Sequence, residues 1–147
     1  MKKKIAVGID YGFKHIGIAA SSPYTNFAIP RAKIARSPDE AKNVDRILQS
    51  VDSASEIDTF VVGLPLHLSG GESLISEIIR KFAKKLENIT NKKVVLLDER
   101  LTSKQAQSLL RETNVKRKKR DEVVDILSAT LILQSYLDYD REEITLC

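Results

Sequence analysis

The stretch that decides the fold is IAVGIDYGFKHIGIAAS, residues 5–21. Two β-like runs, Ile5–Tyr11 and Ile16–Ser21, flank a short segment that begins at Gly12. Valine, isoleucine and aromatic residues favour strands, and glycine permits the backbone angles of a tight turn. The stretch therefore predicts two antiparallel strands joined by a short connection, with Asp10 at the end of the first strand.

Three further β-like runs are expected later in the chain, at Phe27–Ala35, Ile57–Gly63 and Lys93–Leu97. A hydroxyl residue precedes Glu or Gln by three positions at three places, which is the capping-box spacing of a helix start. The three pairs are Ser37 with Glu40, Ser69 with Glu72, and Thr102 with Gln105. Pro38 is expected at the first helical position, where its missing N–H costs nothing.

A last helix is expected over about residues 120–139, because apolar residues cover most of its circumference. The whole order is then β-β-β-α-β-α-β-α-α. Short connections between the first three strands indicate an antiparallel meander, and helices between the later strands indicate parallel crossovers. We therefore expect an α/β fold with a mixed five-stranded sheet, helices on both faces, and one domain over residues 1–147.

Composition excludes several classes of protein. The chain has 147 residues, of which 42% are hydrophobic and 30% charged, and no stretch approaches the roughly 20 apolar residues of a membrane span. Asp10 interrupts the first apolar run too early for a secretory leader. The one cysteine, Cys147, allows no internal disulfide and no cysteine-rich zinc site. A cytoplasmic protein without a membrane partner is expected.

The positive charge is concentrated in one segment. Removing the five consecutive cations would change the net charge from +4 to −1. They are Lys116, Arg117, Lys118, Lys119 and Arg120. Such a run predicts contact with an anionic partner such as a nucleic-acid backbone, and a solvated loop between helices is the alternative.

Carboxylates mark the candidate site. Asp10 ends one predicted strand, Asp98 and Glu99 end another, and Asp125 is the only charged residue between Val123 and Leu133 in an apolar helix. A carboxylate in a packed helix face needs a cation or metal partner, so either an ion pair with Arg100 or a shared metal site is expected. Carboxylate oxygens suit Mg²⁺ or Mn²⁺, and one or two such ions support phosphodiester hydrolysis.

Three residues are weaker candidates for positioning a substrate. Gly12 lets backbone approach a ligand closely, and Arg100 adds a cation beside the carboxylates. His67 follows Gly63-Leu64-Pro65 and could hydrogen-bond a phosphate, but an ordinary loop role is the favoured interpretation.

Four motifs in order resemble the YqgF family, also called RuvX or Holliday-junction-resolvase-like. They lie at residues 8–19, at Val61–Pro65 with Ser69-Gly70, at Asp98–Thr102, and at Val124–Leu137. The resemblance implies an RNase H-like fold and a nuclease of the bacterial cytoplasm that matures the 5′ end of pre-16S ribosomal RNA. Its partner would be that RNA or a pre-ribosomal particle.

The resemblance also implies catalytic, metal-binding roles for Asp10, Glu99 and Asp125. Asp98 is the alternative to Glu99, because adjacent strand residues point to opposite faces and both do not reach one metal.

Other functions stay open from the sequence. A Holliday-junction resolvase would act on branched DNA as a symmetric homodimer with two active sites. A non-catalytic nucleic-acid-binding factor would use the same fold without cleavage. An actin-like phosphotransferase would share the start Gly8–Gly12 but needs two such domains, for which the chain is short.

Overall fold

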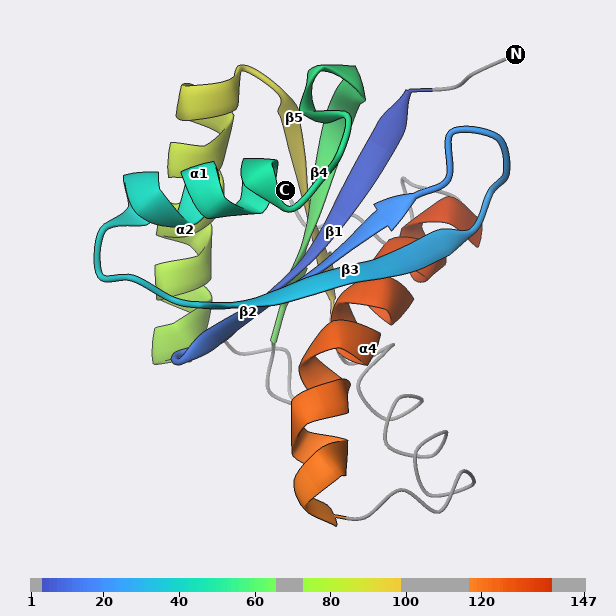
Figure 1. Cartoon of the computed structure of the whole chain (residues 1–147). Helices are drawn as coiled ribbons and strands as arrows, with labels where there is room; N and C mark the ends of the chain where they lie inside the picture. The colour runs from blue at the N-terminus through green and yellow to red at the C-terminus, as the bar shows by residue number, and fades with distance from the viewer. Residues whose placement is uncertain (1–3, 66–72, 99–116, 139–147) are drawn as a thin grey trace.

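The computed structural model describes residues 4–65, 73–98 and 117–138, with the side chains of the last segment from Ile126 onward. One mixed five-stranded sheet forms its centre, in the order β3-β2-β1-β4-β5 (Figure 1). The strands are β1 (Ile5–Tyr11), β2 (His15–Ser21), β3 (Ala28–Ala35), β4 (Ile57–Leu64) and β5 (Lys93–Asp98).

Strand directions follow from the connections. β1 pairs antiparallel with β2, and β2 with β3, because short links join them. β4 pairs parallel with β1, and β5 with β4, each reached through a helical crossover. The predicted meander followed by parallel crossovers is confirmed, and the predicted strand bounds are each within one residue of the observed ones.

Helices lie on both faces of the sheet (Figure 1). α1 (Glu40–Gln49) and α2 (Leu74–Thr90) cover one face, and α4 (Arg117–Asp138) crosses the other. A short 3-10 turn, η1 (Ala54–Glu56), leads into β4. The helix expected after Thr102 lies outside the described residues. No helix in the described ranges is long and apolar enough to cross a membrane.

The predicted helix starts were wrong in detail. α1 is capped by Asp39, whose carboxylate accepts a hydrogen bond from Ala41 N at 3.0 Å, so Pro38 lies outside the helix. The capping box fails because Glu40 instead accepts from the Tyr11 hydroxyl, and Ser37 N donates to Asn43.

α2 also starts later than predicted. Its N-cap is Ser73, beyond the Ser69–Glu72 box, which lies outside the described residues. The Ser76 hydroxyl donates to Pro65 O at 2.5 Å and thereby ties the first turn of α2 to the end of β4. Asn91 ends the helix in the left-handed conformation at φ 55°, a common way to terminate a helix.

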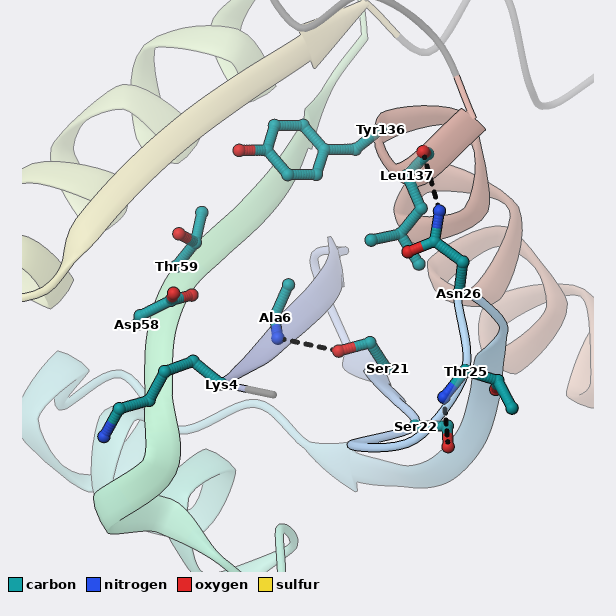
Figure 2. Close-up of a pocket in the computed structure, with 10 residues that line it drawn as sticks. All are labelled: Lys4, Ala6, Ser21, Ser22, Thr25, Asn26, Asp58, Thr59, Tyr136 and Leu137. Carbon is teal, nitrogen blue, oxygen red and sulfur yellow. Dashed lines mark hydrogen bonds between the residues drawn. The ribbon is translucent and has the colours of Figure 1, made fainter. Parts of the chain in front are cut away.

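The α4 face of the sheet is packed closely. Figure 2 shows Tyr136 and Leu137, near the end of α4, on the same side as Ala6 of β1. Among the side chains of α4 that the structure describes, the buried ones form one stripe, while Leu127 and Leu131 are partly buried. This stripe is Ser128, Ala129, Ile132, Leu133 and Tyr136.

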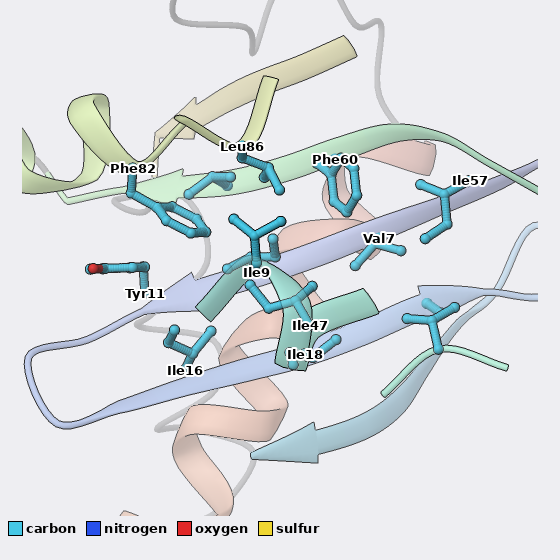
Figure 3. Packing of buried hydrophobic residues seen from close by; sticks show 14 of the residues in the cluster. Val7, Ile9, Tyr11, Ile16, Ile18, Ile47, Ile57, Phe60, Phe82 and Leu86 are labelled. Carbon is cyan, nitrogen blue, oxygen red and sulfur yellow. The ribbon is translucent and has the colours of Figure 1, made fainter. Parts of the chain in front are cut away.

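The opposite face holds the larger apolar core, between the sheet and α1 and α2 (Figure 3). Val7, Ile9 and Tyr11 alternate along β1 and all point into this layer. The Tyr11 ring packs against Phe82 of α2, with ring centroids 4.4 Å apart. Since odd-numbered residues of β1 face this core, the even-numbered ones face α4.

Candidate active site

Asp10 is a partly buried residue near the carboxyl end of β1, on the face that α4 covers. Its neighbours Ile9 and Tyr11 point into the core on the other face, which fixes this direction by alternation. The carboxyl ends of β1, β4 and β5 meet at the same edge because these strands are parallel. Ligands of open α/β sheets bind at this edge.

Helix α4 packs closely against β1 at Gly8. A Cβ atom on Gly8 would lie 2.6 Å from the Ala129 carbonyl oxygen and 2.6 Å from Leu133 Cβ. Only a residue without a side chain therefore permits this packing. Gly8 of the first motif thus has a structural role, because it allows α4 to pack directly on β1, the strand that carries Asp10.

The direction of α4 brings residue 125 level with Asp10. The helix runs opposite to β1, because Tyr136 lies near Ala6 whereas Ala129 lies at Gly8. From Gly8, two strand residues advance about 7 Å to Asp10. From Ala129, four helix residues go back about 6 Å in the same direction. The backbone of Asp125 therefore stands at the level of Asp10.

Asp98 lies on the other face of the sheet. It pairs with Leu64 of β4, and Leu64 belongs to the core beneath α1 and α2. Leu97, its neighbour in the strand, packs against α4 instead. Asp98 is buried and has an interaction of its own, but it does not share the α4 face with Asp10.

A lysine shares the row of Asp10 across the sheet. Asp10 pairs with Gly17 of β2, and Gly17 pairs with Lys33 of β3. Cross-strand partners face the same side, and each strand spacing is about 4.8 Å. The backbones of Asp10 and Lys33 are therefore about 10 Å apart, with the side-chain-free Gly17 between them. The sequence analysis missed Lys33, because only the sheet register reveals this alignment.

A polar network fixes the end of β1. The Tyr11 hydroxyl donates to Glu40 at 2.7 Å and accepts from Arg36 Nε at 2.7 Å. Asn43 Nδ2 donates to the same carboxylate at 2.6 Å and to Ser37 O at 2.8 Å. Burial, together with the Glu40 carboxylate, raises the pKa of Tyr11 far above its ordinary value, so the phenol stays protonated. The network therefore ties Tyr11, the neighbour of Asp10 in β1, to the first turn of α1.

Several predicted site residues are outside what the structure describes. These are Glu99, Arg100, His67, Lys116 and the side chain of Asp125. Gly12 is described, and its N–H donates to His15 O at 2.9 Å to close the turn after β1. Residues 117–120 form the first turn of α4, so four of the five basic residues belong to a helix and not to a loop.

A group of three metal-binding side chains is absent among the residues that the structure describes. Of the three proposed ligands, only Asp10 has a described side chain.

The pocket in Figure 2 lies elsewhere. Its volume is about 160 Å³, and its lining includes Lys4 and Ala6 at the amino-terminal end of β1 and Tyr136 of α4. This pocket is therefore separate from the edge that carries Asp10.

Comparison with known proteins identifies relatives that match most of the chain. A family model described as "RuvX: Holliday junction resolvase" matches residues 4–139. A protein of Koribacter versatilis is 43% identical over 141 residues, which is 93% of this chain and 90% of the relative. A protein of Protochlamydia amoebophila is 39% identical over 137 residues, covering 90% and 91% of the two chains. Both are named "Putative pre-16S rRNA nuclease".

Solved structures support the fold. RuvC of T. thermophilus, in complex with a Holliday junction substrate, superposes with a TM-score of 0.58 at 14% identity. The match covers 97% of this chain and 99% of that one. At this identity the likeness shows the fold alone, which confirms the expected RNase H-like architecture of RuvC-type proteins.

Proposed function

The chain belongs to the RuvX family, a family of nucleases, and we propose on this premise that it matures the 5′ end of pre-16S ribosomal RNA. The reaction would be hydrolysis of phosphodiester bonds in the precursor RNA or a pre-ribosomal particle. The observation that carries the proposal is the seating of α4 on Gly8, because it brings the backbone of Asp125 level with Asp10. We further propose that residues 1–147 act as one domain in the cytoplasm, where ribosomes are assembled.

Asp10, Glu99 and Asp125 would hold a divalent cation, Mg²⁺ or Mn²⁺. The donor chemistry fits, because these hard cations take carboxylate oxygens and bind with few protein ligands. When bound, one or two ions would supply an activated water and stabilise the leaving oxygen of the phosphodiester. Asp10 itself would contribute a fixed anionic ligand, since β1 is paired with a strand on each side.

Glu99 is preferred to Asp98 as the second ligand. Asp98 pairs with Leu64 on the α1 and α2 face, whereas Asp10 belongs to the α4 face. Two carboxylates on opposite faces of one sheet do not reach the same ion. The alternation of β5 therefore favours Glu99, which follows Asp98 directly.

Cations near this edge would hold the polyanionic substrate. Residues 116–120 would contact phosphates without selecting a sequence, as Lys and Arg side chains commonly do. Lys33 would add a further cation in the row of Asp10. Gly12, Arg100 and His67 would position the substrate nearby.

The test is cleavage of a labelled, 5′-extended 16S precursor with Mg²⁺, Mn²⁺ or EDTA. Asp10→Asn and Glu99→Gln should abolish cleavage while the thermal midpoint stays near that of the wild type. Asp98→Asn is the matched control, which should keep cleavage per folded molecule even if burial makes it less stable. Undiminished cleavage by Asp10→Asn would show that the proposed site is wrong.

A Holliday-junction resolvase is the second candidate, and the description of the matching family favours it. That activity would need two active sites and therefore a symmetric dimer on branched DNA. A labelled four-way junction, offered beside the RNA precursor, separates the two substrates, and light scattering gives the oligomeric state. Binding of RNA without cleavage under every metal condition would favour the non-catalytic alternative.

A further inference from the structure

An aromatic side chain projects from the turn directly after Asp10. Phe13 lies between β1 and β2 and is 58% exposed. Single exposed apolar residues are common on protein surfaces, so exposure alone decides nothing. The position of Phe13 is informative, because Phe13 is three residues from Asp10 and three residues span at most about 11 Å. Its ring is therefore within a few nucleotides of any phosphate bound at Asp10.

The turn that carries Phe13 is held in place by its backbone. Gly12 N donates to His15 O at 2.9 Å, and Arg36 N donates to Lys14 O at 2.9 Å. Arg36 Nη1 reaches Phe13 O at 3.3 Å. A side chain on a restrained turn loses less conformational entropy when it binds, so it is suited to contact a ligand.

Arg36 links this turn to the network at the end of β1. Its guanidinium donates to the Tyr11 hydroxyl at 2.7 Å and lies 5.1 Å from the centre of the Tyr11 ring. The backbone of the Phe13 turn and the strand of Asp10 are thus fixed by the same side chain.

Two cationic residues lie near Phe13. Lys14 is exposed beside it in the turn, and Arg36, whose guanidinium reaches Phe13 O, is partly exposed. An aromatic ring among cations is the combination that binds single-stranded nucleic acid: the cations contact phosphates and the ring stacks on a base. A base inside a duplex is already stacked on both sides, so such a ring serves an unpaired or splayed base.

We propose that Phe13 stacks on an unpaired base of the substrate next to the phosphate held at Asp10. The enzyme would then prefer nucleic acid with a single-stranded or splayed nucleotide beside the scissile bond, independent of base identity. This inference rests on the proposed nuclease function and specifies the substrate class of that site.

The experiment uses Asp10→Asn protein and an RNA duplex with a single-stranded 5′ extension. The fluorescent base 2-aminopurine is placed at successive unpaired positions of the extension. Stacking on Phe13 should change its fluorescence at one or two positions only. Phe13→Ala should abolish this change and raise the Kd for the extended RNA by about five- to a hundredfold, as loss of one stacked base does.

Three comparisons separate stacking from a structural role. Phe13→Tyr, which keeps the aromatic ring, should restore binding and the fluorescence change, whereas Phe13→Leu should not. Phe27→Ala is the matched control, because Phe27 is 67% exposed near the other end of β2. This variant should leave the Kd and the fluorescence change as in the wild type. A fully paired duplex of the same sequence should bind all variants equally.

Equal affinity and fluorescence for wild type and Phe13→Ala would overturn the inference, as would an equal loss on paired and extended RNA. The proposed function fails in a different experiment, namely if protein with an intact Asp10 and its Asn variant cleave RNA equally. The two failures are therefore distinguishable.

Discussion

The contact between α4 and Gly8 predicts that Gly8→Ala is strongly destabilising. The added methyl group would lie 2.6 Å from the Ala129 carbonyl oxygen and from Leu133 Cβ, against an optimum of about 3.5–4.0 Å between carbon atoms. Both contacted atoms are fixed to the helix backbone, so no rotation of a side chain relieves the overlap. The helix must move by about 1 Å or lose its packing on β1.

The expected cost is about 3 kcal/mol, the upper end of the range for overpacking a core. For a chain of this size, that corresponds to a fall in Tm of about 6–12 °C. A displaced α4 also displaces the backbone of Asp125 relative to Asp10. Under the proposed roles of these two residues, a shift of about 1 Å lowers activity by up to about a hundredfold. Cleavage should therefore fall even at a temperature where the variant is fully folded.

Thermal unfolding followed by circular dichroism measures the first effect, and cleavage of the labelled precursor measures the second. Ala35→Val serves as the control, because it adds methyl groups at an exposed position of β3 and should change stability by less than about 0.5 kcal/mol. A Gly8→Ala protein with the Tm and cleavage rate of the wild type would refute the close seating of α4 on β1.

Three further predictions concern side chains around the site. Tyr11→Phe should lower the free energy of unfolding by about 1–3 kcal/mol at pH 8, because Glu40 and Arg36 lose a hydrogen-bond partner. Since folding raises the pKa of Tyr11, the wild-type protein loses this stabilisation as the pH rises above about 10. The difference in Tm between the two proteins should therefore shrink by pH 11, and a constant difference would contradict this prediction. Asp39→Ala should lower the free energy of unfolding by about 1 kcal/mol and Ser37→Ala by less, as urea titration can measure, because Asp39 is the N-cap of α1. Lys33→Gln should raise KM for RNA several-fold with a smaller change in kcat, whereas Lys33→Arg should keep the wild-type KM. Unchanged steady-state kinetics of Lys33→Gln would exclude a role of Lys33 in substrate binding.

Much of the fold is local in origin and could be predicted from the sequence. The alternation of apolar residues from Ile5 to Tyr11 specifies a strand, and the glycine at residue 12 permits the turn that follows. Connection length then determines strand direction, because short links join antiparallel strands and helical links join parallel ones. These are properties of neighbouring residues.

The helix starts were harder to predict, because capping depends on competing partners. Ser37 and Glu40 have the spacing of a capping box, but Glu40 bonds with Tyr11, which is 29 residues away in the chain. A local pattern cannot show that a distant hydroxyl is the stronger partner. Asp39 caps the helix instead.

The candidate site divides in the same way. The sequence alone determined which carboxylates are unusual, since Asp10 ends a strand and Asp125 stands in an apolar helix. It also showed that Asp98 and Glu99 could not both face one ion, because alternation is a local rule. That Asp98 lies on the face away from Asp10 required the pairing of Asp98 with Leu64 and the packing of Leu64 in the core.

Tertiary structure alone aligned Lys33 with Asp10. The pairing of β2 with β3 shifts between Ile18 and Ala19, where Arg31 is an extra residue in β3. A bulge of one residue moves every later side chain to the opposite face, so without it Lys33 would point to the α1 and α2 face. The register of two strands is set by packing over the whole sheet, and the sequence of one strand does not contain it.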